Sequence, residues 1–181
     1  MNNLTAFLDL GWSVIKTGVA DGTSPARYPT LSTVSPDGWP EARTLAVRHA
    51  DRTLMLVESH TDITSDKLRS LAQSPRIGYH FWDPATQIQI RLWTTVEVVT
   101  GDAVAPLWDR IPPNSRLSYG ETPSPGTPIP TATAYVKEPD QTAFGVLRCT
   151  IQKMDVVDLN VPHRRAHFER SDQWAGTWLA P

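Results

Sequence analysis

A cluster of cationic and hydroxyl side chains stands where a helix is expected to begin. Thr61, Ser65 and Lys67 lie in one short stretch, and Ser65 could cap a helix that begins near Asp66. The apolar residues that follow have helical spacing: Leu68, Leu71 and Ala72. Because a helix dipole disfavours the charge of Lys67 in the first turn, a bound anion would offset that cost, and Arg43 could add a guanidinium fork. The alternative is a capped surface helix with solvated charges.

Arg43 belongs to a segment typical of a β-strand, Arg43–Arg48, which follows a turn at Pro36-Asp37-Gly38. Side chains alternate along a strand, so Arg43 and Arg48 face opposite sides and cannot share a site on a regular strand. Either a β-bulge turns one of them, or they serve different sites, for example across a dimer interface. We favour the second interpretation. For Arg48, a solvent-facing strand end is an equal alternative.

The elements around this cluster are mostly strands. An amphipathic helix is expected over residues 3–19 and a short one over 103–110. The expected strands cover residues 28–35, 43–48, 53–57, 76–82, 87–100, 143–159, 163–170 and 174–179. Because short turns join them with few helices between, the pattern predicts antiparallel pairing and a barrel.

One long segment has no regular pattern. Residues 115–133 contain Pro123, Pro125, Pro128 and Pro130 without hydrophobic periodicity, so no regular element is expected there. A loop of that length inside a compact domain is usually functional or disordered. The remainder of the chain after it is too short to fold alone, so we do not interpret the segment as a domain linker.

Composition narrows the function classes. A chain of 181 residues with a net charge of −2 is expected to form one domain, residues 1–181, that binds neither nucleic acid nor a membrane. We expect it in the cytoplasm, because its N-terminus lacks the pattern of a signal peptide. Its one cysteine, Cys149, forms no disulfide framework or metal cluster and is expected to be buried in a strand. No nucleophile or phosphate-loop motif is present, which favours an enzyme whose cofactor carries the chemistry.

Together these segments resemble the FMN-binding split barrels related to pyridoxamine 5'-phosphate oxidase. The residues that carry the resemblance are Arg43-Thr44-Leu45-Ala46-Val47-Arg48, Thr61-Asp62 with Ser65 and Lys67, Gln89-Ile90-Arg91, and a tryptophan-rich end that finishes Leu179-Ala180-Pro181. Their order and spacing extend over nearly the whole sequence. The resemblance implies a mainly β fold with peripheral helices, an FMN-binding split β-barrel of antiparallel Greek-key type.

The resemblance also implies FMN as the cofactor and a set of site residues. By it, the FMN phosphate is held by Arg43, Thr61, Ser65 and Lys67. The backbone along the flavin ring is that of Thr44, Leu45, Ala46 and Val47, and Gln89 hydrogen-bonds the ring. Because sites of this family lie between two subunits, it implies a homodimer. One departure is Asp66, where the oxidases have an arginine, and an acid there weakens the attraction for phosphate.

The substrate half of the site departs further from the family. The oxidases hold the substrate phosphate with Lys, Tyr, Arg and Ser, and matching places these residues there: Arg48, Leu107, Ile111 and Ser115. Two contacts have therefore become apolar, although Arg110 and Arg116 lie near enough in sequence to substitute. Arg164 matches a late arginine that touches substrate and flavin, but the His-Asp-Arg that follows it in the oxidases is absent.

We therefore expect an FMN-dependent oxidase or reductase that transfers a hydride between the flavin and a small molecule other than pyridoxamine 5'-phosphate. No side chain is identified as catalytic, and no metal is expected. Three alternatives stay open: a non-enzymatic flavin-binding or regulatory module, a true pyridoxamine 5'-phosphate oxidase, and a deazaflavin in place of FMN.

Overall fold

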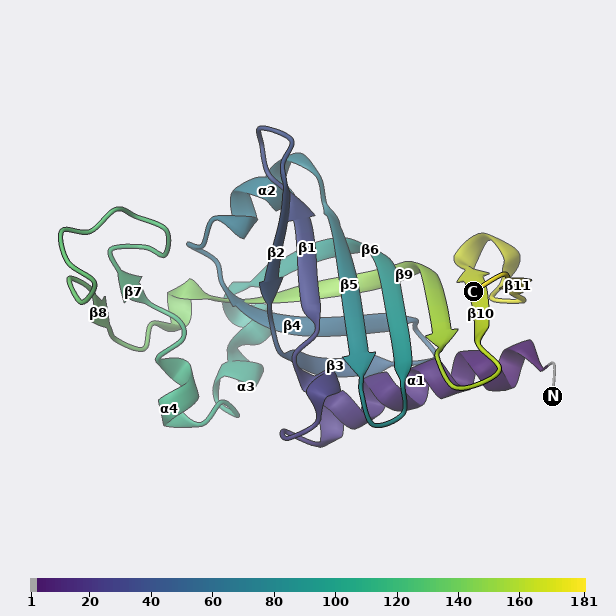
Figure 1. Cartoon of the computed structure of the whole chain (residues 1–181). Coiled ribbons are helices and arrows are strands. Elements are labelled where there is room, and N and C mark those ends of the chain that lie inside the picture. The colour runs from purple at the N-terminus through teal and green to yellow at the C-terminus, as the bar shows by residue number, and fades with distance from the viewer. Residues whose placement is uncertain (1–2) are drawn as a thin grey trace.

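An antiparallel sheet of nine strands forms the body of the structure, a computed structural model that describes residues 3–181 (Figure 1). Its strands are β1 (Thr30–Val34), β2 (Pro40–Thr44), β3 (Val47–Asp51), β4 (Leu56–Asp62), β5 (Arg76–Asp83), β6 (Ile88–Thr100), β9 (Phe144–Asp158), β10 (Arg164–Glu169) and β11 (Thr177–Leu179). Every pairing is antiparallel, so the predicted mainly β, antiparallel class is confirmed.

The long strand β9 joins the two halves of the sheet. The strand order is β11-β10-β9-β6-β5-β1-β2, and β4 pairs with both β3 and β9. Within residues 3–181 no ladder joins β2 to β3, so the strands do not close into a barrel. Figure 1 shows β10, β11 and both termini at one end of the molecule and the proline-rich segment at the other.

Helix α1 (Leu4–Ala20) covers the core on one side. It begins and ends one residue after the predicted bounds of 3–19, has Asn3 as its N-cap, and contacts β3, β6, β9 and β10. Its buried face includes Phe7, Trp12 and Ile15, which pack against strand residues such as Phe81 and Phe168. Cys149 is fully buried in β9, as predicted. No helix of the described residues is both long enough and apolar enough to cross a membrane.

A second, smaller cluster fixes the segment after β6. That segment contains η2 (Gly101–Val104), α3 (Ala105–Trp108) and α4 (Pro113–Arg116). Trp108 and Tyr119 pack against Phe144 of β9, with ring centroids 5.6 and 5.0 Å from its ring. The remaining members of the cluster are Val104, Ile111 and Val146. This cluster holds Leu107 to Tyr119 against the same end of β9.

Three predictions about elements need correction. The segment predicted as one strand over 43–48 is two strands, because β2 pairs with β1 while β3 pairs with β4. The segment over 115–133, predicted to have no regular element, contains the end of α4 and β7 (Glu121–Thr122), which pairs with β8 (Val136–Lys137). The strand predicted over 53–57 begins only at Leu56 of β4, because residues 52–55 form a turn. The segment expected as strand over 143–159 is one continuous strand, β9.

The end of α1 is joined tightly to η1 (Pro25–Arg27), the turn that precedes β1. Arg27 Nη1 donates to the carbonyl oxygens of Gly18 and Val19 at 3.3 and 2.8 Å. A Cβ atom on Gly18 would overlap the backbone carbonyl of Ala26, and backbone cannot move aside as a flexible side chain can. The glycine is therefore required by close packing, within a helix that would otherwise favour alanine.

We predict that Gly18→Ala destabilises the protein. Alanine gains up to about 1 kcal/mol of helix propensity, but overpacking against η1 costs about 1–3 kcal/mol, so the free energy of unfolding should fall. Gly22→Ala is the matched control, because no atom lies within 4 Å of a Cβ there. Denaturant unfolding of both variants checks this, and a Gly18→Ala protein as stable as the control would contradict it.

Candidate functional site

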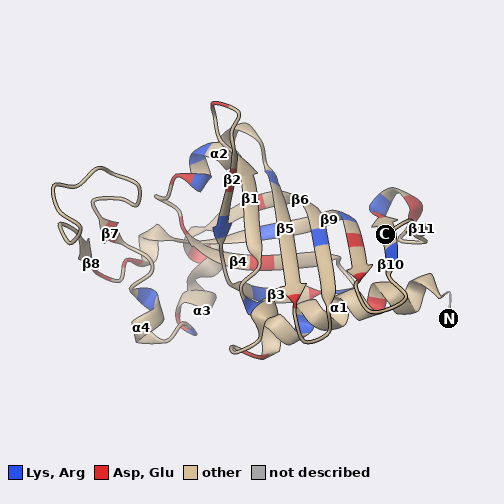
Figure 2. Cartoon of the chain, in the orientation of Figure 1, with Lys and Arg blue, Asp and Glu red and all other residues tan. Residues whose placement is uncertain are grey.

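The site lies where the chain leaves one pairing partner for another. After Thr44 the chain stops pairing with β1, and at Val47 it begins to pair with β4, so Leu45 and Ala46 form a corner outside both strands. A pocket of about 270 Å³ opens at this corner, lined by Leu45, Ala46, Arg48, His60, Thr61, Asp62, Ser65, Lys67, Ser118, Tyr119 and Pro125. We call this the corner pocket. Figure 2 shows Lys and Arg residues on β2, α2 (Lys67–Gln73) and α4.

Lys67 reaches back across the corner pocket to the end of β4. Its Nζ donates to Thr61 Oγ1 at 2.9 Å and to Ser65 Oγ at 2.5 Å. Both hydroxyl groups in turn donate to the carbonyl oxygen of Asp62, at 3.1 and 2.6 Å. The structure therefore brings Thr61, Ser65 and Lys67 together, as the sequence predicted, into one ordered set of donors.

The predicted helix cap at Ser65 is wrong. The N-cap residue of α2 is Asp66, and it makes no side-chain capping bond. Ser65 Oγ bonds to the Asp62 carbonyl instead of to a free N–H group of the helix. Asp66 pairs with Arg69 on the surface of α2. With only seven residues, α2 contributes Lys67 as a side chain, and the helix dipole is not the basis of the site.

Arg43 lies beside the corner pocket but does not line it. Its guanidinium donates to Thr33 Oγ1 at 2.7 Å and pairs with Glu41 at 2.9 Å, so its charge is already partly satisfied. The pKa of Lys67 is lowered, first by burial and then by the charge of Arg43, while Asp62 and Asp66 oppose the shift. An anion placed at Lys67 would be attracted by both cations.

Arg48 occupies the place in the corner pocket that Arg43 was expected to fill. The ladder between β3 and β4 shifts register between Val47 and His49, so Arg48 is the extra residue of a β-bulge. The bulge and the corner together break the alternation of a regular strand. Arg43 and Arg48 have different surroundings, and the β-bulge that was the other interpretation is present.

Asp62 connects the corner pocket to the segment after α4. One carboxylate oxygen accepts from the N–H and hydroxyl groups of Thr64, and the other accepts from the backbone N–H of Gly120 at 2.9 Å. This bond places Ser118 and Tyr119 on the rim of the pocket. Part of the segment predicted to be a functional loop thus lies at the site.

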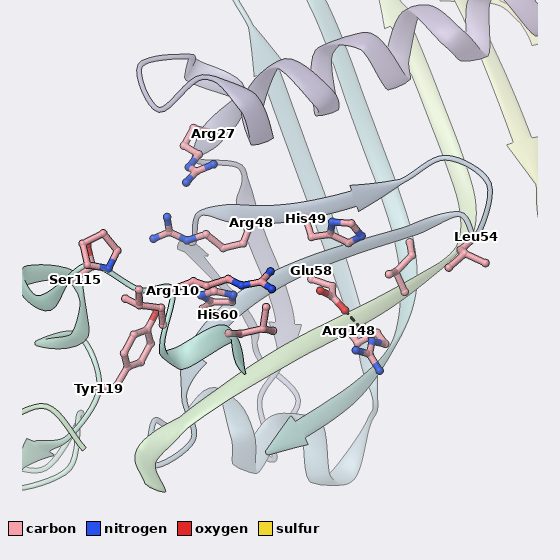
Figure 3. Close-up of a pocket in the computed structure, with 14 residues that line it drawn as sticks. Arg27, Arg48, His49, Leu54, Glu58, His60, Arg110, Ser115, Tyr119 and Arg148 are labelled. Carbon is pink, nitrogen blue, oxygen red and sulfur yellow. Dashed lines mark hydrogen bonds and ion pairs between the residues drawn. The ribbon is translucent and has the colours of Figure 1, made fainter. Parts of the chain in front are cut away.

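A larger pocket of about 940 Å³ adjoins the corner pocket and shares Arg48, His60 and Tyr119 with it (Figure 3). We call it the arginine pocket. It is lined by Arg27, Arg48, His49, Leu54, Leu56, Glu58, His60, Leu107, Arg110, Ile111, Pro112, Ser115, Tyr119 and Arg148. In Figure 3, Arg48 and Arg110 lie on the same side as His60 and Tyr119, Arg27 lies apart from them near the end of α1, and Arg148 lies at the far side with Leu54.

The arginines of the arginine pocket differ in their partners. Arg148 pairs with Glu58 at 2.7 Å, and Arg27 is partly bound by the end of α1. Within residues 3–181, the guanidinium groups of Arg48 and Arg110 have neither a hydrogen-bond partner nor an ion-pair partner. Two guanidinium groups are therefore free to bind an anion beside the walls formed by Leu107 and Ile111.

The four positions matched to the substrate phosphate contacts of the family all line the arginine pocket. Arg48 and Ser115 provide polar groups there, and Leu107 and Ile111 provide apolar ones. Arg110 lines it too. Arg116 does not, because its guanidinium bonds to the Ile111 and Asp109 carbonyls and lies over the Trp108 ring.

Gln89 and Arg164 lie at the other end of the sheet. Thr61 is opposite Gly145 of β9, whereas Gln89 is opposite Val157 and Arg164 is opposite Asp158. Twelve residues of β9 separate Gly145 from Val157, roughly 40 Å along the strand at about 3.3 Å each. Arg164 is paired with buried Asp158 at 2.5 Å and lies over the Phe7 ring. One chain does not bring these two residues to the corner pocket.

His60 is a site residue that the sequence reasoning missed. It lines both pockets, and its ring packs edge-on against Phe144 with centroids 5.0 Å apart. The pKa of His60 is lowered to about 4, first by burial and then by the charge of Arg48. Its place beside Thr61 in the sequence was not a sufficient signal, because neighbouring side chains of a strand point to opposite faces. Within the described part of the chain no metal-binding group of His, Cys, Asp or Glu side chains is present.

The donors of the corner pocket suit the phosphate of FMN. Lys67, Thr61 and Ser65 form a preassembled set of one cation and two hydroxyls, and Arg48 adds a free guanidinium. Phosphate oxygens accept hydrogen bonds from such groups, and ionised partners give the stronger bonds. The corner at Leu45–Ala46 leaves backbone outside the sheet, where a ring system can lie against it.

Comparison with known proteins identifies the family. A sequence profile described as pyridoxamine 5'-phosphate oxidase, FMN-binding domain, matches residues 11–100, which include the corner, the Lys67 cluster and Gln89. The chain belongs to this family of pyridoxamine 5'-phosphate oxidase-related FMN-binding proteins.

Relatives and solved structures agree with this assignment. The pyridoxine/pyridoxamine 5'-phosphate oxidase of Nostoc punctiforme is 35% identical over 88 residues, which are 49% of this chain and 40% of that oxidase. A pyridoxamine 5'-phosphate oxidase-related, FMN-binding protein of the same species has a TM-score of 0.79 at 25% identity, covering 96% of both chains. PhzG from Burkholderia lata, solved with tetrahydrophenazine-1-carboxylic acid, shares the fold, with a TM-score of 0.75 at 20% identity over 97% of this chain and 92% of PhzG.

Proposed function

We propose that this chain binds FMN and catalyses flavin-dependent oxidation or reduction of a small molecule. The observation that carries the proposal is the preassembled cluster of Lys67, Thr61 and Ser65, placed beside a large pocket with two free guanidinium groups. The first suits a phosphate, and the second suits an anionic reactant next to it.

The residues of the corner pocket would bind and orient the cofactor. Lys67, Thr61 and Ser65 would hold the phosphate, with Arg43 adding its charge from behind, and the Thr44–Val47 backbone would lie along the ring. Bound FMN would supply hydride transfer, which no side chain of the site can perform. Arg48 and Arg110 would orient the reactant, and the wall formed by Leu107 and Ile111 would limit water around it.

Two other functions in the same fold are distinguishable. A deazaflavin in place of FMN would be revealed by titrating the protein with each cofactor. A flavin-binding or regulatory module would bind FMN but leave it inert toward nicotinamides and amines. The enzyme is favoured because a pocket of about 940 Å³ adjoins the proposed cofactor site, which a module that only stores FMN does not require.

We predict that purified protein is yellow or takes up FMN, and that Lys67→Met weakens FMN binding far more than riboflavin binding. Only FMN carries the phosphate, and a charged hydrogen bond is worth roughly 1.5–3 kcal/mol, or about 10- to 150-fold in affinity. Arg69→Met is the matched control, because Arg69 is an exposed cation of α2 that pairs with Asp66. Fluorescence titration with both ligands measures the difference, and equal losses would rule out the phosphate assignment.

We further propose a homodimer in which each FMN site uses both chains. The corner pocket and the pair Gln89 and Arg164 lie at opposite ends of one chain, so a second copy would have to supply the latter. A closed two-fold dimer gives two equivalent sites of this kind. The split-barrel fold is also part of this proposal. In one chain the sheet is open between β2 and β3, so a single chain does not form a closed barrel.

Mixed dimers test this arrangement. Lys67→Met and Gln89→Ala protomers, co-expressed with different tags and purified through both, should form dimers with one site of normal FMN affinity and one doubly damaged site. If each site used a single chain, the same dimers would have two weakened sites and none of normal affinity. Titration of FMN per dimer distinguishes these results. A monomer mass in light scattering at micromolar concentration with FMN bound would refute the dimer itself.

We also predict that pyridoxamine 5'-phosphate is a poor substrate. Leu107 and Ile111 line the arginine pocket where matching places polar contacts to that phosphate. Each lost contact forfeits roughly 1.5–3 kcal/mol, so two losses reduce discrimination by roughly two to four powers of ten. Steady-state oxidation of pyridoxamine and pyridoxine 5'-phosphates by the FMN-loaded protein measures this. A kcat/KM of about 10⁴ M⁻¹s⁻¹ or more would identify a true oxidase.

A further inference from the structure

His60 occupies the boundary between the corner pocket and the arginine pocket. It is one of three residues that line both, with Arg48 and Tyr119 (Figure 3). His60 and Thr61, which belongs to the Lys67 cluster, both line the corner pocket, where the cofactor phosphate is expected. A reactant in the arginine pocket and a cofactor in the corner pocket would both contact this ring.

The His60 ring is held in place while its nitrogen atoms stay available. The ring packs at 90° against Phe144, a fully buried residue, with centroids 5.0 Å apart. Neither ring nitrogen has a hydrogen-bond partner in residues 3–181, and neither is among the buried polar atoms left without one. Both nitrogens are thus open to the pockets and free to bond to a ligand.

Burial and the neighbouring charges keep the imidazole of His60 neutral when the site is empty. The pKa of His60 is lowered to about 4, first by burial and then by the charges of Arg48 and Arg27, while Glu58 opposes the shift. The charged and titratable groups of the two pockets around it are Arg27, Arg48, His49, Glu58, Asp62, Lys67, Arg110, Tyr119 and Arg148. An anionic reactant bound at Arg48 and Arg110 would cancel part of this positive field and make the imidazole a stronger base.

We propose that His60 accepts the proton released when a reactant is oxidised in the arginine pocket. This inference rests on the proposed function, because the oxidant is the bound flavin. In the step, a C–H bond of the reactant breaks and its hydrogen leaves with the electron pair to the flavin. The neighbouring N–H or O–H bond breaks, its proton passes to an unprotonated His60 nitrogen, and a C=N or C=O bond forms. In the reverse direction His60 returns the proton.

Histidine titration tests the electrostatic part of the proposal. The chain has five histidines, and His60→Gln assigns the His60 imidazole signals by NMR. Titration without ligand should give a pKa near 4, and titration with inorganic phosphate or with benzoate should raise it by one unit or more. Comparison of the two probes shows whether a phosphate or a carboxylate supplies the negative charge that raises the His60 pKa. Arg48→Met should remove most of the probe-dependent rise, and a His60 pKa that stays near 4 with both probes would overturn the proposal.

Reduction of the bound flavin tests the proton transfer. Anaerobic reduction of the FMN-loaded protein by a panel of primary amines and alcohols should be 10²- to 10⁴-fold slower in His60→Gln. His60→Gln should slow reduction by amines and alcohols more than it slows reduction by a dihydronicotinamide, because the dihydronicotinamide gives up a hydride without releasing an N–H or O–H proton. The wild-type rate should fall as the pH falls through the His60 pKa, because the protonated ring cannot accept. His80→Gln, an exposed histidine of β5, is the control.

The outcomes separate this inference from the proposed function. Protein that takes up neither FMN nor another flavin defeats the proposed function before His60 is tested. Protein that binds FMN, but in which His60→Gln slows amine and dihydronicotinamide reduction equally and keeps the wild-type pH profile, overturns the inference alone. Failure of every amine and alcohol while the dihydronicotinamide reduces the flavin also counts against it.

Discussion

The change of pairing partner at Leu45–Ala46 is the constraint on which the site depends. A strand that stayed beside β1 would keep its polar backbone inside one ladder and its side chains in strict alternation. Instead β2 ends, the chain turns, and β3 begins beside β4 with a bulge at Arg48. Apart from the Leu45 N–H, which bonds to the Pro29 carbonyl at 3.3 Å, the backbone of the corner lies outside the sheet ladders, and Arg48 lines both pockets. Both are consequences of a single change in hydrogen-bond partners.

Unpaired positive charge is the second property of the site. Arg48 and Arg110 are exposed at a pocket and have no side-chain partner in the described residues, and Lys67 is half-buried on two hydroxyls. Such an arrangement costs stability in the empty protein, because like charges repel and burial disfavours them. The lowered pKa values of Lys67 and His60 are direct results of that repulsion and burial. A bound anion relieves both.

Most elements and part of the site could be predicted from the sequence. Strand alternation and turn residues gave the antiparallel sheet, and the spacing of Thr61, Ser65 and Lys67 was enough to group them. The role of Ser65 was not predictable, because its hydroxyl bonds to a carbonyl that only the folded turn brings near. The corner and the bulge depend on which strands pair, a long-range choice that the Arg43–Arg48 segment does not encode by itself. The place of His60 in the site could not be predicted, because it depends on two pockets that only the fold forms. The separation of Gln89 from the corner pocket could not be predicted either, because it depends on the register of β9.

Asp66 departs from the family pattern without placing its negative charge in the corner pocket. An acid next to a phosphate site would repel the ligand if its charge faced the pocket. The Asp66 carboxylate is exposed on α2 and paired with Arg69, so its charge is largely neutralised at the surface. It also supports the protonated form of Lys67, as Asp62 does, against burial and the charge of Arg43. A lysine that must stay charged to bind an anion benefits from a carboxylate placed behind it, so the loss of an arginine at position 66 is compatible with a working cation in the corner pocket.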